Sequence, residues 1–369
     1  MTRAPGSNLL IVRGLKMLRF DPVLAGLLLL LMGFGCMVLY SAGEQNMALL
    51  LRQAVRLGLG LAVMLAAAQV PPRLLKAWAV PVFAVALLLL LAVDIVGVGR
   101  GTQRWLDLGV IRFQPAEAMK LALPLMLALL LDRKPLPPDW QTLAVAAVFI
   151  AVPVVLIANQ PDLGTAVLIG ASGACVLFLA GLRWRIIVAL GAILAAAAPL
   201  AWLSLRQYQR DRILTFVSPE SDPLGQGWNI IQSKIAVGSG GLGGKGWLAG
   251  SQSHLEFLPE PHTDFIFSVL AEEFGFVGVA VILLLYAAII LRSAWLASRC
   301  RDPFARLLAG AVVFMFFLYL TVNVGMASGM LPVVGVPLPL VSYGGTSAVT
   351  LLAGFGLIMG LHSRRRFMG

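Results

Sequence analysis

Charged residues are scarce in this sequence, and their scarcity decides the class of protein. Asp, Glu, Lys and Arg make up 12% of the 369 residues, about half the share that a soluble domain carries. Hydrophobic residues make up 59%, and the mean hydropathy is +0.90. The apolar runs exceed about 18 residues, which is too long for helices in a soluble core. These features exclude a soluble enzyme and predict an all-α integral membrane protein rather than a β-barrel.

Cysteine and histidine are also rare. The three cysteines, Cys36, Cys175 and Cys300, are far apart in the sequence, which predicts neither a disulfide framework nor a metal site. His254 and His262 have no third ligand at the spacing of a zinc site. The sequence contains no P-loop, which argues against an ATP site. We therefore expect no cofactor and no metal motif, although a divalent cation could still assist catalysis.

Ten apolar runs predict ten transmembrane helices in a single polytopic membrane domain, residues 1–369. About seventeen of the 28 basic residues fall on one side of this arrangement. The positive-inside rule assigns that side and both termini to the cytoplasm, which predicts a multi-pass membrane protein. The net charge of +11 follows from this orientation and does not indicate nucleic-acid binding. The predicted spans are 21–42, 48–69, 77–98, 115–131, 140–158, 164–181, 186–204, 264–292, 304–326 and 341–361.

The longest connection, residues 205–263, joins the seventh and eighth spans on the extracytoplasmic side. It is polar and rich in glycine, and loops of this length are usually functional. Asp264 stands where this loop enters the eighth span, and an acid at the membrane boundary is costly unless it has a role. Glu272 and Glu273 lie two turns deeper and cannot share a helix face. At least one is expected to pair or bind inside the bundle, and both could equally be structural. Residues 327–342 are rich in Pro and Gly and predict a broken or re-entrant segment.

Charged residues near the outer side of the fourth span admit two interpretations. Glu117 and Lys120 stand three residues apart on one helix face. They could neutralise each other and fix helix packing, or Lys120 could meet an anionic group in a cavity while Glu117 orients it. Arg104, with Arg100 and Arg112 nearby, could meet lipid headgroups or clamp a diphosphate.

Four other features of the chain are also ambiguous. Asp162 is expected to cap the sixth span, and Asp264 could cap the eighth span in the same way. The stretch 238–246, which contains Lys245, could be a flexible turn or a phosphate-binding loop. Asp94 is interpreted as an unpaired intramembrane acid in a packing or partner contact.

Six motifs together indicate a family. They are GxxRW at 101–105, QPAEAMK at 114–120, NQPDLGT at 159–165, GQGWNIIQSKIAVGSGGLGGKG at 225–246, PEPHTDFIFSVLAEEFGFVG at 259–278 and SYGGTS at 342–347. With these motifs the chain resembles, over nearly its whole length, the SEDS family (shape, elongation, division and sporulation), which includes RodA and FtsW. The short N-terminal segment and the spacing look more like RodA. The resemblance implies a SEDS-type fold with a large loop between helices seven and eight.

The resemblance also implies an activity and partners. It implies a peptidoglycan glycosyltransferase that polymerises lipid II into glycan strands at the outer face of the cytoplasmic membrane, for cell-wall elongation and rod shape. It implies a class B penicillin-binding protein as the transpeptidase partner, together with membrane proteins of the elongation complex and membrane lipid. The essential acid of the family falls on Asp264, and the functionally important acid and base of the QPAEAMK motif fall on Glu117 and Lys120.

Such a reaction needs a base for the incoming sugar hydroxyl and cations for the departing polyprenyl diphosphate. We expect Asp264 to be the base and Lys120, Arg104 and Lys245 to be the cations. Three alternatives remain: a flippase for the lipid-linked precursor, a scaffold that only holds the transpeptidase, and a division-type polymerase like FtsW. The flippase is disfavoured because the polar residues gather on one side and no inverted repeat is visible.

Overall fold

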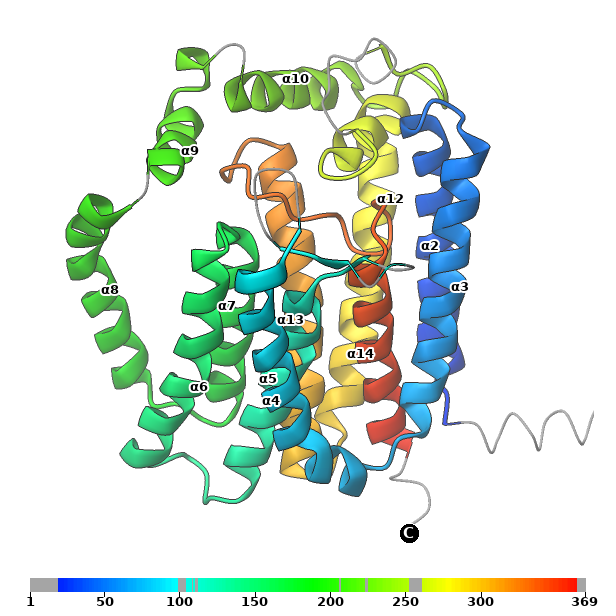
Figure 1. Cartoon of the computed structure of the whole chain (residues 1–369). Coiled ribbons are helices and arrows are strands. Elements are labelled where there is room, and N and C mark those ends of the chain that lie inside the picture. Colours follow the sequence, from blue (N-terminus) through cyan, green and yellow to red (C-terminus); the bar gives the residue numbers. More distant parts are fainter. Residues whose placement is uncertain are drawn as a thin grey trace, which may run out of the picture.

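Long helices run side by side through most of the molecule (Figure 1). The structure is a computed structural model. The short helix α10 (Gln226–Ser239) lies across one end of the bundle, which we call the loop end. Helix α2 (Pro22–Ala42) starts, and helix α14 (Thr346–Ser363) ends, at the opposite end, which we call the tail end. The structure describes residues 19–98, 104–107, 109, 112–205, 207–222, 225–251 and 261–363.

Apolar helices dominate the described part of the chain, as the composition predicts. Seven of them are long and apolar enough to cross a membrane. This result confirms the all-α integral membrane class. The seven helices are α2, α3 (Met47–Gln69), α4 (Pro72–Val96), α6 (Trp140–Asn159), α12 (Ile266–Ser298), α13 (Pro303–Ala327) and α14.

Three further helices coincide with the remaining predicted spans. Helix α5 (Pro115–Asp132) carries three charged residues, which lower its apolar character. Helix α7 (Leu163–Leu179) has only 17 residues. Helix α8 (Trp184–Ser204) lies at the margin of the bundle (Figure 1). Each predicted span therefore has a corresponding helix, while the number of membrane crossings stays a prediction.

Helix α5 lies in the centre of the bundle, in contact with α4, α6, α7, α13 and α14. Its apolar side chains are buried on nearly all faces; Met119, Leu123 and Leu127 are completely covered. A helix that is apolar all round is typical of such a central position. The charges of α5 therefore lie inside the protein rather than against lipid.

Ion pairs tie helix ends together at the tail end. Lys76 on α4 lies 2.7 Å from Asp132 and 3.0 Å from Asp302. Arg292 on α12 lies 2.7 Å from Asp21, which also caps α2. Two residues of the predicted cytoplasmic basic set, Lys76 and Arg292, are thus held by acids between neighbouring helices.

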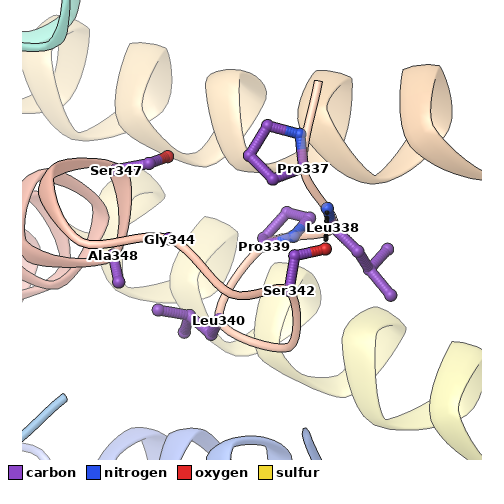
Figure 2. Close-up of a pocket in the computed structure, with 8 residues that line it drawn as sticks. All are labelled: Pro337, Leu338, Pro339, Leu340, Ser342, Gly344, Ser347 and Ala348. Atoms are coloured by element: carbon purple, nitrogen blue, oxygen red, sulfur yellow. Dashed lines mark hydrogen bonds between the residues drawn. The ribbon is translucent and has the colours of Figure 1, made fainter. Parts of the chain in front are cut away.

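The predicted broken segment is non-helical between α13 and α14, and protein covers it. Val336, Leu338 and Val341 are buried. The Ser342 hydroxyl accepts a hydrogen bond from the Leu338 main-chain N–H, at 2.8 Å, which closes a turn (Figure 2). The Tyr286 hydroxyl on α12 donates to the Pro339 carbonyl at 2.6 Å. Irregular backbone inside a membrane protein needs such partners, because lipid offers none.

The connection 205–263 is more ordered than a polar, glycine-rich loop suggests. It contains α9 (Gln207–Val217), a 3-10 turn η1 (Pro219–Ser221) and α10. The hydroxyl of Ser233 on α10 is buried, donates to the Ala327 carbonyl at 2.5 Å, and lies 2.6 Å from the hydroxyl of Ser268. Helix α10 is therefore docked onto the start of α12 and the end of α13.

Candidate active site

A cavity of about 250 Å³ lies at the N-terminal ends of α5 and α7. The segment between α13 and α14 and the residues just before α12 form its other walls. Three acids and two cations line it: Glu117, Asp162, Asp264, Lys120 and Arg104. Four of the five residues predicted for the site therefore meet in one place, although they come from distant parts of the sequence.

The Glu117–Lys120 pair lies at the start of α5. Pro115 occupies the first turn, where its missing N–H costs nothing, and Glu117 follows in the same turn, where a carboxylate complements the helix dipole. One oxygen of Glu117, Oε1, lies 2.5 Å from Lys120 Nζ. Glu117 is 5% exposed and Lys120 is 3% exposed. The two side chains form a desolvated ion pair that opens onto the cavity.

The ion pair leaves hydrogen-bonding capacity unused. The second oxygen of Glu117, Oε2, is buried and has no hydrogen-bond partner among the described residues. The Lys120 ammonium lies 4.6 Å from the centre of the Tyr319 ring on α13. The hydroxyl of Tyr319 is likewise buried without a described partner. Buried polar atoms in native proteins are usually bonded, so these two suit a polar ligand in the cavity.

Asp162 caps α7, as predicted, and also lines the cavity. Its Oδ1 accepts from the Thr165 main-chain N–H at 3.2 Å. Its Oδ2 accepts from Gln114 at 3.2 Å and lies 3.8 Å from an Arg104 nitrogen. This contact accounts for the carboxylate without requiring it to bind a ligand.

Arg104 is held against the turn that precedes α7. The next residue, Trp105, forms an antiparallel β-bridge with Val98. A two-stranded antiparallel pair follows, made of β1 (Leu106–Asp107) and β2 (Arg112–Phe113). Its Nε donates to the Gln160 carbonyl at 3.2 Å, and Nη2 donates to the Pro161 carbonyl. Main-chain acceptors thus fix the guanidinium at the edge of the cavity.

Asp264 reaches the cavity from the loop that enters α12. The N-cap of that helix is Phe265, so Asp264 lies one residue before the cap position. Asn323 on α13 donates to the main-chain carbonyls of Asp264, at 2.9 Å, and Val336, at 2.7 Å. The neighbouring Thr263 carbonyl accepts from the Ser342 hydroxyl at 2.5 Å. The backbone at Asp264 is thereby tied to α13 and to the non-helical segment.

Lys245, the fifth predicted site residue, is not among the described residues that line the cavity. Its ammonium lies 2.6 Å from Glu272 Oε1 on α12 and donates to the Ser251 hydroxyl at 2.7 Å. Ser251 donates to the same carboxylate oxygen at 3.0 Å. The structure therefore places Lys245 in a second, separate ion pair. The adjacent acid, Glu273, accepts from Ser41 on α2.

The glycine-rich stretch packs against a break in α12. Gly275 has φ +61° and ψ −162°, which interrupts the helix. Main-chain N–H groups of Lys245 and Gly246 donate to the carbonyls of Glu272 and Glu273, both at 3.0 Å. In return, Phe276 and Val277 donate to Gly241 and Leu242. These bonds satisfy the groups that the break exposes, so they argue against a phosphate-binding loop.

Other sequence interpretations also change. Asp94 is not unpaired, because Gln160 donates to its Oδ1 at 3.0 Å. Arg100, His254 and the basic tail 364–366 lie outside the described residues. Among the residues that the structure describes, no three His, Cys, Asp or Glu side chains are grouped as metal ligands.

Tyr319 and Asn323 were missed by the sequence analysis, although a signal exists. They stand four residues apart in the apolar helix α13, and residues at that spacing share a face. Two polar groups on one face of a membrane helix indicate a polar environment inside the bundle. Tyr319 lines the cavity, and Asn323 holds its wall by donating to the Asp264 and Val336 carbonyls.

Comparison with known proteins places this geometry in a family. A family model described as "Cell cycle protein", FTSW_RODA_SPOVE, matches residues 19–367. The peptidoglycan glycosyltransferase MrdB of Escherichia coli K12 is 49% identical over 350 residues, which cover 94% of this chain and 95% of that protein. A probable peptidoglycan glycosyltransferase FtsW of Geobacter metallireducens is 36% identical over 362 residues, covering 94% of this chain and 96% of the relative.

Solved structures agree with the sequence relatives. The rod shape determining protein RodA of Thermus thermophilus matches with a TM-score of 0.72 and 34% identity, covering 95% of this chain and 98% of that chain. A chain from a study titled "Structural coordination of polymerization and crosslinking by a peptidoglycan synthase complex" matches with a TM-score of 0.83 and 36% identity, covering 95% of this chain and 99% of that chain.

Proposed function

The chain belongs to the FTSW_RODA_SPOVE family and is a peptidoglycan glycosyltransferase, and we propose that the cavity beside α5 and α7 is its active site. The proposed donor is lipid II, and the proposed product is a glycan strand for cell-wall elongation and rod shape. One observation carries the assignment: the buried Glu117–Lys120 pair opens onto the same cavity as Asp264, and buried polar atoms beside it have no hydrogen-bond partner among the described residues.

Asp264 acts as the general base in this proposal. The hydroxyl of the acceptor sugar attacks the anomeric carbon of the donor, and its proton passes to the Asp264 carboxylate. A new carbon–oxygen bond forms while the bond to the polyprenyl diphosphate breaks, with inversion at the anomeric carbon. A positioned base contributes roughly 10²–10⁴-fold to such a step.

Lys120 stabilises the departing diphosphate. Its ammonium is desolvated, so its attraction for a phosphate oxygen is stronger than it would be in water. Glu117 orients the ammonium through Oε1. Arg104, which main-chain carbonyls fix at the cavity edge, is the second cation that contacts the substrate. No step in this scheme requires a cofactor.

The proposed orientation places the cavity outside the cytoplasm. Helices α5 and α7, whose N-terminal ends border the cavity, run toward the tail end, where α4 begins and α12 ends (Figure 1). The predicted cytoplasmic residues Lys76 and Arg292 belong to those two segments of α4 and α12. We therefore assign the tail end and both termini to the cytoplasm, in the cytoplasmic membrane.

A class B penicillin-binding protein is the proposed partner. The support is the similarity to a chain from a peptidoglycan synthase complex that coordinates polymerization and crosslinking. A polymerase that works beside a transpeptidase delivers each new strand directly to the cross-linking step. Membrane proteins of the elongation complex are proposed as further partners.

The test compares two Asp→Asn variants of the purified full-length chain together with its transpeptidase partner. Asp264→Asn is expected to slow strand formation from lipid II by about 10²-fold or more. Asp139→Asn is the matched control, because Asp139 caps α6 and does not line the cavity. Strand formation at the normal rate by a correctly folded Asp264→Asn variant would rule out the base.

The same preparation distinguishes an enzyme from a flippase. Liposomes that carry labelled lipid II are expected to yield strands without movement of the headgroup across the bilayer. Headgroup movement without strands would favour the flippase.

A further inference from the structure

Tyr319 occupies an unusual position on α13. Its side chain is 1% exposed and packs against Leu168, Met315 and Val336, yet it also lines the cavity. A phenylalanine would make the same apolar contacts. The hydroxyl therefore needs an explanation of its own.

Nothing in the described protein explains the hydroxyl of Tyr319, because it is buried and has no hydrogen-bond partner there. Tyr286 is also fully buried in the described bundle, and its hydroxyl donates to the Pro339 carbonyl at 2.6 Å. An unpaired buried hydroxyl costs free energy, and most buried tyrosines find a partner for the O–H group. The difference between the two tyrosines indicates that the hydroxyl of Tyr319 bonds to a ligand in the cavity.

The surroundings indicate what kind of ligand that is. The Lys120 ammonium lies 4.6 Å from the centre of the Tyr319 ring and is buried with it. Oε1 of Glu117 is bonded to the Lys120 ammonium, at 2.5 Å. A donor hydroxyl beside a desolvated cation suits an anion with several acceptor oxygens, and a diphosphate is such an anion.

We propose that Tyr319 contacts the substrate: its hydroxyl donates a hydrogen bond to a phosphate oxygen of the polyprenyl diphosphate leaving group, beside Lys120. This proposal rests on the proposed function and names a further residue of that site. When the bond from the anomeric carbon to the diphosphate oxygen breaks, the electron pair stays on that oxygen. Tyr319 keeps its proton, and the proton of the acceptor hydroxyl passes to Asp264.

The ring and the hydroxyl of Tyr319 have separate tasks in this account. The ring holds the Lys120 ammonium through a cation–π contact, which any aromatic ring at that place could provide. Only the hydroxyl donates to the leaving group. Tyr319→Phe therefore removes one task and leaves the other intact.

The first test compares Tyr319→Phe with the matched variant Tyr286→Phe in strand formation from lipid II. Loss of a hydrogen bond to a charged group is expected to slow Tyr319→Phe by roughly ten- to a hundredfold. Its thermal midpoint should not fall, because the lost hydroxyl has no hydrogen-bond partner among the described residues. Tyr286→Phe should show the reverse: a lower midpoint and an unchanged rate per folded molecule.

The second test measures binding without turnover. Farnesyl diphosphate is the probe, farnesol is the control without phosphate, and the readout is the rise in thermal midpoint of the full chain. The unsubstituted chain and Asp264→Asn should show the same rise with farnesyl diphosphate, and Tyr319→Phe a smaller one. Equal rises in Tyr319→Phe and the unsubstituted chain, or no rise in either, would overturn the proposal.

The two proposals fail in different ways. If the unsubstituted chain and its partner form no strands while farnesyl diphosphate still binds through Tyr319, the proposed function fails and the diphosphate contact stands. If strands form and Tyr319→Phe forms them at the full rate, the contact fails and the function stands.

Discussion

Two lysine–glutamate pairs in the described part of the chain have the same charged groups and different surroundings. Lys120 and Glu117 stand one turn apart on α5, and both are almost fully buried. Lys245 and Glu272 are 27 residues apart in sequence; the lysine is 30% exposed and the glutamate is fully buried. The first pair faces a cavity where Glu117 Oε2 and the Tyr319 hydroxyl lack a partner in the described part of the chain. The second pair is closed by Ser251 and by main-chain hydrogen bonds.

The difference between the two pairs separates a structural ion pair from one that is available to a ligand. A pair whose remaining atoms are satisfied by the protein fixes two elements together, here the glycine-rich stretch and the broken helix α12. A pair with unsatisfied neighbours in a cavity is arranged for something that binds there. Burial alone does not distinguish the two cases, because buried pairs are weak evidence for either stability or catalysis.

The largest expected effect comes from Lys120→Met. The variant should lose about 10²–10³-fold in the rate of strand formation, because the leaving group loses its desolvated cation. It should also lose about 3–5 kcal/mol of stability, because Glu117 is left buried without its partner. Thermal unfolding and the polymerisation assay measure the two losses separately.

The double variant Glu117→Gln with Lys120→Met controls for the stranded charge. Its thermal midpoint should recover most of the loss, while its rate should stay low. Recovery of both quantities would mean that the first pair is structural, like the second, and the contrast between the pairs would disappear.

Gly275→Ala should have the next largest effect, and it concerns stability. Gly275 has φ +61°, and an added Cβ would lie 2.3 Å from the Gly244 nitrogen. Backbone strain and this overlap together are expected to cost on the order of 3 kcal/mol or more. Gly243→Ala is the matched control, since Gly243 has no positive φ and nothing within 4 Å of the added atom. Equal thermal midpoints for the two variants would contradict the close packing of the stretch on α12.

Lys245→Met should have the smallest of the three effects. It removes one donor to Glu272 and leaves Ser251 in place, so about 1–3 kcal/mol of stability should be lost. The rate of strand formation per folded molecule should stay close to that of the unsubstituted chain. A fall in rate like that of Lys120→Met, at unchanged stability, would return Lys245 to the catalytic site.

The positions of most helices along the chain could be predicted from the sequence. The ten apolar runs correspond to helices with ends that agree within a few residues, apart from the start of the predicted third and tenth spans and the end of the eighth. The reason is that length and apolar composition act locally. The spacing of Glu117 and Lys120 also determined their contact, because residues three apart on a helix are neighbours.

Other features could not be predicted because they depend on partners far away in sequence. Asp94 accepts a hydrogen bond from Gln160, which is 66 residues away in the sequence. The glycine-rich stretch forms main-chain hydrogen bonds with the break in α12 at Gly275. The helices α9 and α10 were not assigned from the polar composition of their connection. Each depends on what lies opposite after folding, which no local pattern records.

By itself the sequence determined a helical membrane protein, its family motifs and a short set of charged residues from which to choose. Only the tertiary structure separated Lys120 from Lys245, since that required knowing which side chain meets a cavity and which meets a buried carboxylate. It also revealed Tyr319, which lines the cavity beside Lys120 and whose hydroxyl has no partner in the described part of the chain. The physical reason is that the free energy of a buried charge or hydroxyl depends on the atoms within a few ångströms of it. Residues far apart in the sequence supply those atoms.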